Sequence, residues 1–148
     1  RVGKTYIALV WGRFALSEGE INLPIGRSRS DRKKMAVSLD RGREAITRFK
    51  VIQEFDNCSL LEINPITGRT HQIRVHLSYI GHPIIGDKQY GNKDSDKLAK
   101  ELGLGRQFLH AKKLIFTHPV SGKKMVIEDD LEDDLDATLE KLRRDHGM

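Results

Sequence analysis

Several features that would indicate a secreted or membrane protein are missing from this 148-residue sequence. Its single cysteine, Cys58, cannot form an internal disulfide. No apolar stretch approaches the roughly 20 residues that a bilayer-spanning helix needs, and no charged-then-apolar leader opens the chain. We therefore expect a soluble, cytoplasmic protein without a membrane partner.

Internal repeats, low-complexity linkers and an internal domain boundary are also missing. With 38% hydrophobic residues, the chain can bury a core in one compact unit, but it is too short for two full domains. It opens on Arg1 instead of a methionine and runs almost at once into a strand-like segment. This opening leads us to expect a truncated protein.

Acidic residues are scarce over most of the chain, although the formal net charge is only +5. Seven of them are concentrated in residues 128–136, whereas residues 1–127 carry 23 Lys and Arg against 12 Asp and Glu, a net charge of +11. A basic excess favours a polyanionic partner, because Lys and Arg near phosphates release counterions from nucleic acid. A solvated basic surface is the alternative, and charge alone does not separate an enzyme from a binding module.

The hydrophobic pattern predicts an α+β protein with a mixed, mostly antiparallel β-sheet and few helices. Residues 5–11 (TYIALVW) are apolar on both faces, which is typical of a buried strand. Residues 45–55 alternate, and residues 59–63 (SLLEI) follow across a turn, so the two segments predict an antiparallel hairpin. Further strands are predicted at residues 20–23, 34–38, 108–116 and 124–127.

Helices are predicted at residues 71–80, with Thr70 as the N-cap, and as a brief turn at residues 98–102. In the first helix we expect an apolar face toward the core and a polar face formed by His71, Arg74 and Ser78. The last segment is predicted to be helical, with its acidic residues at the helix start and not in a metal site. The expected core residues of these helices are Ile73, Leu77 and Ile80 in the first, and Leu131, Leu135, Leu139 and Leu142 in the last.

The densest group of polar residues lies at residues 64–77 (NPITGRTHQIRVHL), where a strand ends and a helix begins. Free backbone N–H groups of residues 67–70 would bind a phosphate or carboxylate there, beside the Arg69 guanidinium. His71 and His76 are five residues apart and do not share a helical face, so we expect no metal. For Arg74, a surface arginine paired with a neighbour is the alternative to a site residue.

These segments resemble the signature of the RluA-type RNA pseudouridine synthases. The main block is residues 65–77, and the similarity extends over about residues 4–127 in the right order. It implies that residues 1–148 are the C-terminal portion of a pseudouridine synthase catalytic domain, with the N-terminal half of the same enzyme as a partner. The other matching segments are residues 4–6 (KTY), 8–12 (ALVWG), 81–87 (GHPIIGD), 90–91 (YG), 109–111 (LHA) and 116–119 (FTHP).

The resemblance implies isomerisation of uridine in ribosomal or transfer RNA without a cofactor: the base is flipped out, its glycosidic bond is cut, and it is rejoined through C5. Tyr6 would lie against the flipped uracil and is a candidate for proton transfer at C5. Arg74 would pair with the catalytic aspartate, while Leu109 and Ile73 would supply apolar walls that exclude water. Ordinary core packing is the alternative for these side chains.

The catalytic aspartate of the family lies in an arginine–leucine–aspartate motif upstream of the lysine–x–tyrosine strand, and this sequence begins after that point. The nearest match, Leu39-Asp40, follows Ser38 and lies downstream of Tyr6, so we reject it. Asp87 is rejected too, because hydrogen bonding in a turn is its expected role. We therefore predict that the chain alone is inactive.

RNA binding is predicted at two places. Arg69, Thr70 and His71 form one group, at the polar junction. The second is the most concentrated basic stretch of the chain, where side chains would grip phosphates. A non-catalytic RNA-binding module that shares the fold is the alternative function, and a structural RNA protein is disfavoured because it would not need the proposed catalytic set. The basic stretch consists of Arg27, Arg29, Arg32, Lys33 and Lys34.

Overall fold

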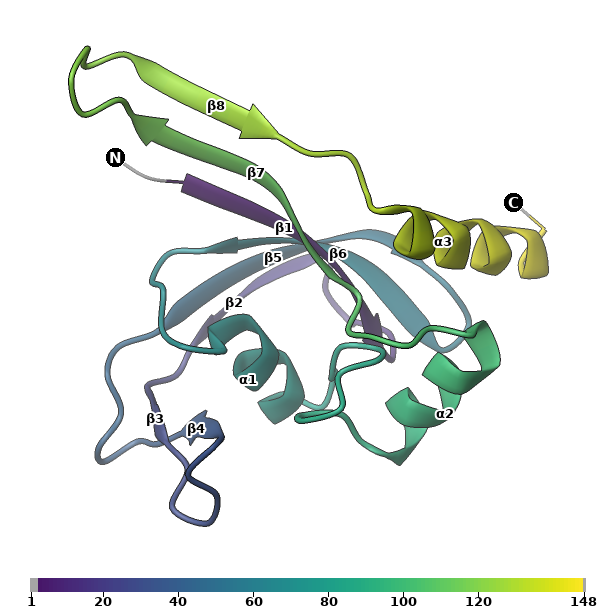
Figure 1. Ribbon diagram of the computed structural model, residues 1–148. Coiled ribbons are helices and arrows are strands. Elements are labelled where there is room, and N and C mark those ends of the chain that lie inside the picture. Colours follow the sequence, from purple (N-terminus) through teal and green to yellow (C-terminus); the bar gives the residue numbers. More distant parts are fainter. Residues whose placement is uncertain (1–2, 148) are drawn as a thin grey trace.

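The computed structural model describes residues 3–147 and is built on a six-stranded antiparallel sheet in the order β2-β5-β6-β1-β7-β8 (Figure 1). A separate two-stranded sheet pairs β3 with β4. The predicted α+β class with a mostly antiparallel sheet is confirmed. The strands are β1 Gly3–Trp11, β2 Glu18–Asn22, β3 Ile25–Arg27, β4 Met35–Val37, β5 Ile46–Glu54, β6 Cys58–Pro65, β7 Leu109–Thr117 and β8 Lys124–Glu128.

Strand β1 lies inside the sheet, between β6 and β7, and it is buried on both faces as its apolar run predicts. Ile7 and Leu9 pack in one core cluster, whereas Ala8 and Val10 pack in another. Because successive side chains of a strand point to opposite faces, β1 separates two layers of core. Tyr6 belongs to the second layer.

The helices cover both faces of this sheet. Helix α1 (Gln72–Tyr79) packs in the same core cluster as Ala8, while α2 (Lys93–Leu102) and α3 (Asp133–Asp145) pack in the cluster of Leu9. The acidic start of α3 is confirmed, with Asp133, Asp134 and Asp136 in its first turn. Its predicted apolar stripe is buried at Leu135, Leu139 and Leu142, and Leu131 packs against the same cluster just before the helix.

Three details of the helix prediction are wrong. The N-cap of α1 is His71 and not Thr70, and it adopts a left-handed backbone conformation with φ of 56°. Ile80 is 36% exposed, because the helix ends one residue earlier. Helix α2 is much longer than a brief turn, since a reciprocal cap between Asn92 and Ser95 starts it at residue 93.

Two hairpins extend from this body. Strands β7 and β8 form an arm in which every residue of β8 is exposed (Figure 1). Strands β3 and β4 form the smaller one near α1, and β3 was not predicted from the sequence. Between residues 3 and 147, no helix is both long and apolar enough to cross a bilayer.

Candidate active site

A cleft of about 400 Å³ opens where β1, β7 and the start of α1 meet. It brings together all three residues of the proposed catalytic set, Tyr6, Arg74 and Leu109. Arg69 and His71 from the predicted RNA contacts also line it, whereas Thr70 does not. The remaining lining residues are Lys4, Pro65, Ile66, Thr67, Gly68, Gln72 and Ile73.

The position of Tyr6 follows from its strand. It pairs with Ile63 on β6 and with Ala111 on β7, and a register shift interrupts the β1–β7 ladder directly before it. Its side chain is half-buried and packs against the same core cluster as Ile73 of α1. The ring therefore forms one apolar wall of the cleft, opposite the polar start of the helix.

The buried amide of Gln72 organises the turn that leads into α1. Its Oε1 accepts hydrogen bonds from Thr67 Oγ1 (2.6 Å) and from the Arg69 backbone N–H (3.0 Å), while its Nε2 donates to Ile46 O (2.9 Å) on β5. The Thr67 backbone N–H also donates to Ile46 O (3.5 Å). The expectation of four free N–H groups at residues 67–70 is therefore wrong: two of them are already used within the protein.

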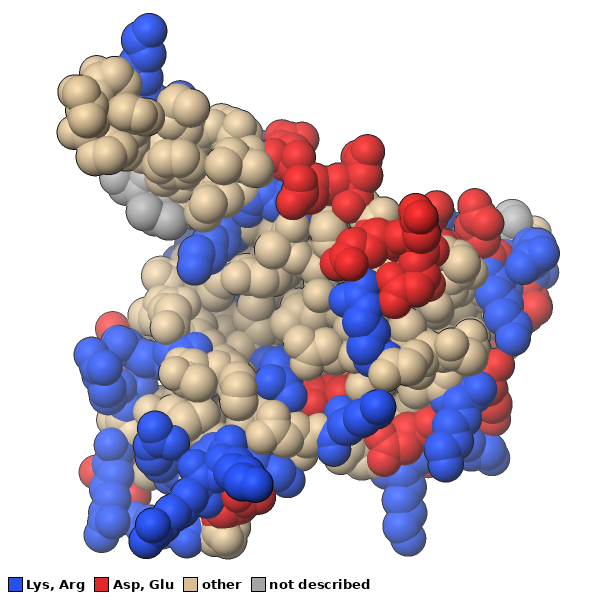
Figure 2. All heavy atoms as spheres, viewed as in Figure 1, with Lys and Arg blue, Asp and Glu red and all other residues tan. Residues whose placement is uncertain are grey.

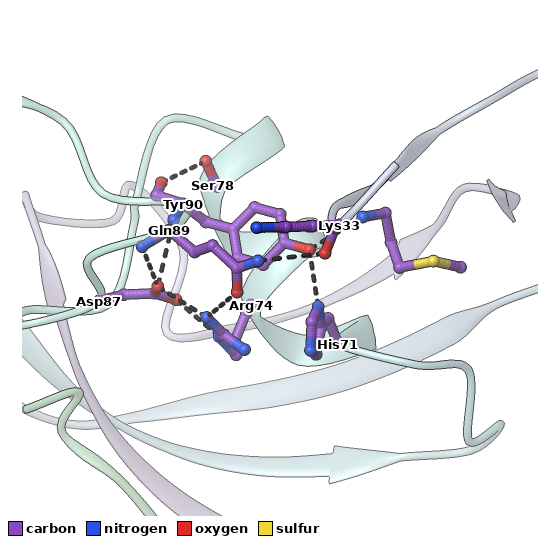
Figure 3. Close-up of polar contacts among 8 residues, drawn as sticks. Lys33, His71, Arg74, Ser78, Asp87, Gln89 and Tyr90 are labelled. Carbon is purple, nitrogen blue, oxygen red and sulfur yellow. Dashed lines mark hydrogen bonds and ion pairs between the residues drawn. The ribbon is translucent and has the colours of Figure 1, made fainter. Parts of the chain in front are cut away.

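Arg74 forms a bidentate ion pair with Asp87, both of whose hydrogen bonds are 2.9 Å (Figure 3). Its Nη2 also donates to Gln89 Oε1 (2.9 Å), and its guanidinium lies 4.8 Å from the centre of the Tyr90 ring. The Arg74 side chain is 15% exposed and that of Asp87 is fully buried. The alternative for Arg74, a surface arginine paired with a neighbour, is therefore half right: Arg74 is paired, but its side chain is mostly buried.

The electrostatics of this pair fix both charges. Burial alone would raise the pKa of Asp87, but hydrogen bonds from Arg74 and from the backbone N–H groups of Tyr90 and Gln89 outweigh it, so the pKa lies below its usual value. The hydrogen bond to Asp87 raises the pKa of Arg74. Turn hydrogen bonding, the role predicted for Asp87, is confirmed, and the ion pair is an addition that the sequence did not reveal.

His71 and Tyr90 extend the polar group beside the cleft. His71 Nδ1 lies 2.7 Å from Tyr90 Oη, and Ser78 Oγ donates to Tyr90 O (2.8 Å). His71, Arg74 and Ser78 therefore share one face of α1, as predicted, and Tyr90 is what they face. Burial, and then the charge of Arg74, lower the pKa of His71. This shift favours the neutral form of the ring.

The segment that carries Asp87 and Tyr90 is held against the end of β1. The Trp11 backbone N–H donates to Pro83 O and that of Ile85 to Leu9 O, each at 2.9 Å. At Gly91, a Cβ atom would collide with the carbonyl oxygen of Asp87, so this tight turn accepts only glycine. The turn thereby places the Asp87 carboxylate beneath α1.

The predicted basic stretch lies apart from the cleft, in the β3–β4 hairpin. Figure 2 shows blue side chains gathered over this part of the molecule. Arg29 pairs with Asp40 (2.6 Å), and Arg27 Nη1 donates to the carbonyl oxygen of Arg32 (3.2 Å). Arg32 and Lys33 are exposed. Of the five basic residues, Arg29 therefore already has an acidic partner within the protein.

Comparison with known proteins identifies the family. Residues 1–79 match the family model described as RNA pseudouridylate synthase. The chain belongs to this family. A ribosomal large subunit pseudouridine synthase C of Haemophilus influenzae is 40% identical over 143 residues, covering 96% of this chain and 44% of that protein. An uncharacterized RNA pseudouridine synthase of Mycobacterium bovis is 44% identical over 142 residues. The RluA-type resemblance is confirmed, and the chain spans less than half the length of these relatives.

Solved structures of pseudouridylate synthase domains share the fold. The human RNA pseudouridylate synthase domain containing 1 protein superposes with a TM-score of 0.77 at 30% identity, covering 93% of this chain and 59% of that one. The human domain containing 4 protein gives a TM-score of 0.74 at 28% identity. Both comparisons place nearly the whole chain within the pseudouridylate synthase fold.

Two parts of this candidate site were missed by reasoning from the sequence: Asp87 as the partner of Arg74, and Tyr90, whose ring lies against the Arg74 guanidinium. Both residues belong to the matching block of the family, so that block was the available signal. Which side chains meet depends on the direction of the turn at residues 87–90, and residue spacing does not specify that direction.

Proposed function

We propose that this chain is the C-terminal portion of the catalytic domain of an RNA pseudouridine synthase that isomerises uridine to pseudouridine in ribosomal RNA, without a cofactor. The observation that carries the proposal is the meeting of Tyr6, Arg74 and Leu109 at one cleft. The names of relatives that specify the large ribosomal subunit favour ribosomal over transfer RNA.

The cleft suits a flipped base. Its volume of about 400 Å³ is ample for a uracil ring. Tyr6, Ile73 and Leu109 supply apolar surface against which the base can stack after it leaves the helix. In the reaction the bond from C1′ to N1 breaks, a bond from C1′ to C5 forms, the proton on C5 leaves, and N1 takes up a proton. We assign Tyr6 to the wall beside C5, where its phenol can take part in that proton transfer.

Arg74 has a donor left for a second carboxylate. Nε and Nη2 bind Asp87 and Gln89, whereas Nη1 donates to none of the atoms of residues 3–147. We propose that Nη1 receives the catalytic aspartate, which would come from the part of the enzyme that precedes this chain. A cation held in this fixed orientation favours the ionised aspartate that attacks the sugar or base.

The experiment uses the full-length enzyme that contains this chain. Purified enzyme is incubated with unmodified ribosomal RNA transcripts, and pseudouridines are mapped at single-nucleotide resolution. We expect conversion at one or a few defined uridines, and a Tyr6→Phe variant, which keeps the ring and loses the phenol, should convert them more slowly. Binding of RNA without any conversion by the wild-type enzyme would instead favour the non-catalytic RNA-binding module.

A further inference from the structure

A four-residue turn, Asp87 to Tyr90, contacts both the basic hairpin and residues that line the cleft (Figure 3). On one side it contacts the backbone of the β3–β4 hairpin, and on the other it contacts two side chains that line the cleft. The contacts run through two side chains, Gln89 and Tyr90. Each therefore touches both the hairpin and the cleft.

Gln89 forms the first of these links. Its Oε1 accepts from Arg74 Nη2 (2.9 Å), and its Nε2 donates to the carbonyl oxygen of Lys33 (3.1 Å). One amide group thus joins the cleft arginine to the most basic part of the hairpin. The link depends on the hairpin conformation, because the acceptor is a backbone carbonyl whose direction changes if the loop refolds.

Tyr90 forms the second link, parallel to the first. Its hydroxyl accepts from the backbone N–H of Met35 (2.9 Å) and lies 2.7 Å from His71 Nδ1. Its ring lies beneath the Arg74 guanidinium, and Lys34 Nζ lies 6.0 Å from the ring centre. The two links together connect the backbone at Lys33 and Met35 to the side chains of Arg74 and His71.

We propose that Gln89 and Tyr90 are positioning residues that couple the basic hairpin to the cleft, so that RNA phosphates bound by the hairpin fix the orientation of Arg74. In the linked conformation the hairpin keeps its hydrogen bonds to Gln89 and Tyr90, and Arg74 is held in the orientation seen in the structure. RNA that binds this conformation stabilises that orientation of Arg74. The coupling free energy is the same in the other direction, so the orientation of Arg74 favours RNA binding equally. The inference rests on the proposed function. It adds that RNA bound at the hairpin, away from the reacting base, orients Arg74 in the cleft.

Three substitutions separate the two halves of this coupling. Gln89→Met keeps the shape and loses both hydrogen bonds. Gln89→Glu keeps an acceptor for Arg74, now charged, and loses the donor to Lys33 O, so of the two hydrogen bonds it breaks only the one to the hairpin. Tyr90→Phe keeps the ring beneath Arg74 and loses both bonds of the hydroxyl. The matched control is Gln107→Met: Gln107 lies near Gln89, and its side chain makes no hydrogen bond within residues 3–147.

The test measures, in the full-length enzyme, the single-turnover rate at saturating RNA, the dissociation constant for RNA and the melting temperature. We expect all three variants to lower the rate about tenfold while the dissociation constant stays within about twofold of wild type, and Gln107→Met to match wild type in both. A purely structural role would lower the melting temperature without this separation of rate from affinity. A wild-type rate in Gln89→Glu, or a loss of affinity equal to the loss of rate, would overturn the coupling.

A second readout keeps this inference separate from the proposed function. If the wild-type enzyme makes no pseudouridine, the proposed function fails, and the NMR signal of the Arg74 Nε–H decides the coupling by itself. On addition of an RNA that binds the hairpin, that signal should shift in the wild type and remain in place in Gln89→Glu. An identical response in both proteins would overturn the coupling whatever the enzyme catalyses.

Discussion

At the scale of single residues, the site depends on one ion pair whose two partners have different exposure. Asp87 is fully buried and accepts four hydrogen bonds, two from Nε and Nη2 of Arg74 and two from backbone N–H groups. A carboxylate so well supplied with donors remains ionised despite its burial. It binds Nε and Nη2 of Arg74 and leaves Nη1 for another partner.

Replacing Arg74 by lysine in the full-length enzyme should lower catalysis more than RNA affinity. Lysine keeps the charge but loses the planar fork that binds Asp87 through two bonds. We expect a decrease of roughly tenfold to a thousandfold in the single-turnover rate, about 1.4–4 kcal/mol of transition-state stabilisation. Arg48→Lys is the control, because its pair with Glu20 is exposed. A rate equal to wild type would refute the role of the ion pair, and an equal loss of affinity would make Arg74 a phosphate contact.

The Asp87 pair should also give the protein a characteristic loss of stability in acid. Because the folded pKa of Asp87 lies below its unfolded value of about 3.9, the stabilisation is fully present above that value and is lost as the pH falls through the folded pKa. Asp87→Asn should lower the free energy of unfolding at pH 7 by about 3 kcal/mol. The difference from wild type should shrink from about pH 5 downward in urea titrations. Asp40→Asn, which affects an exposed pair, should change little, and a difference from wild type that stays constant from pH 7 to pH 2 would contradict this assignment.

At the scale of elements, the strands and helices that could be predicted are those with a clear hydrophobic pattern along their whole length. The apolar run of β1, the alternation of β5 and the leucine stripe of α3 each give an unambiguous pattern. Strand β3 was missed because three residues after a proline carry no period at all. Helix α2 was reduced to a turn because its first half is charged, and the signal that starts it is the Asn92 and Ser95 cap.

The site shows the same division between pattern and geometry. Residues such as Tyr6 and Leu109 could be assigned from the resemblance to a family, and the structure places both at one cleft. The left-handed backbone of His71 could not be foreseen, since a Thr at position 70 is the better N-cap by preference. No side chain caps the helix there, and Gln72, the first helical residue, instead accepts hydrogen bonds from Thr67 and Arg69 in the turn before it.

The β3–β4 hairpin is the element we predict to bind phosphates. Replacing Arg32, Lys33 and Lys34 together by alanine should weaken binding by a similar factor for unrelated RNAs. The slope of log affinity against log salt concentration should fall by roughly 0.7–0.9 for each phosphate that the hairpin no longer binds. The control replaces Lys93, Lys97 and Lys100 of α2, which removes the same charge from another element. An unchanged slope in the hairpin variant would show that the hairpin is only a solvated basic turn.

At the scale of the whole molecule, the core around β1 is extensive, whereas the lining of the cleft lacks a carboxylate among the described residues. Core layers pack on both faces of β1, and every buried side-chain polar atom of residues 3–147 has a hydrogen-bond partner. The residues that line the cleft, in contrast, include cations and a phenol but no carboxylate. The relatives are more than twice as long as this chain, so their additional residues can supply that group.

We therefore predict that residues 1–148 alone fold but make no pseudouridine. Within residues 3–147, the lining of the cleft holds no carboxylate that could act as a nucleophile, and the carboxylate that Arg74 binds, that of Asp87, is buried and lies outside that lining. The chain is incubated with RNA from cells that lack modification enzymes, with and without the separately purified remainder of the enzyme, and pseudouridines are mapped. Circular dichroism first verifies that the chain is folded. We expect conversion only when both parts are present, so specific conversion by the folded chain alone would show that its own residues supply the nucleophile.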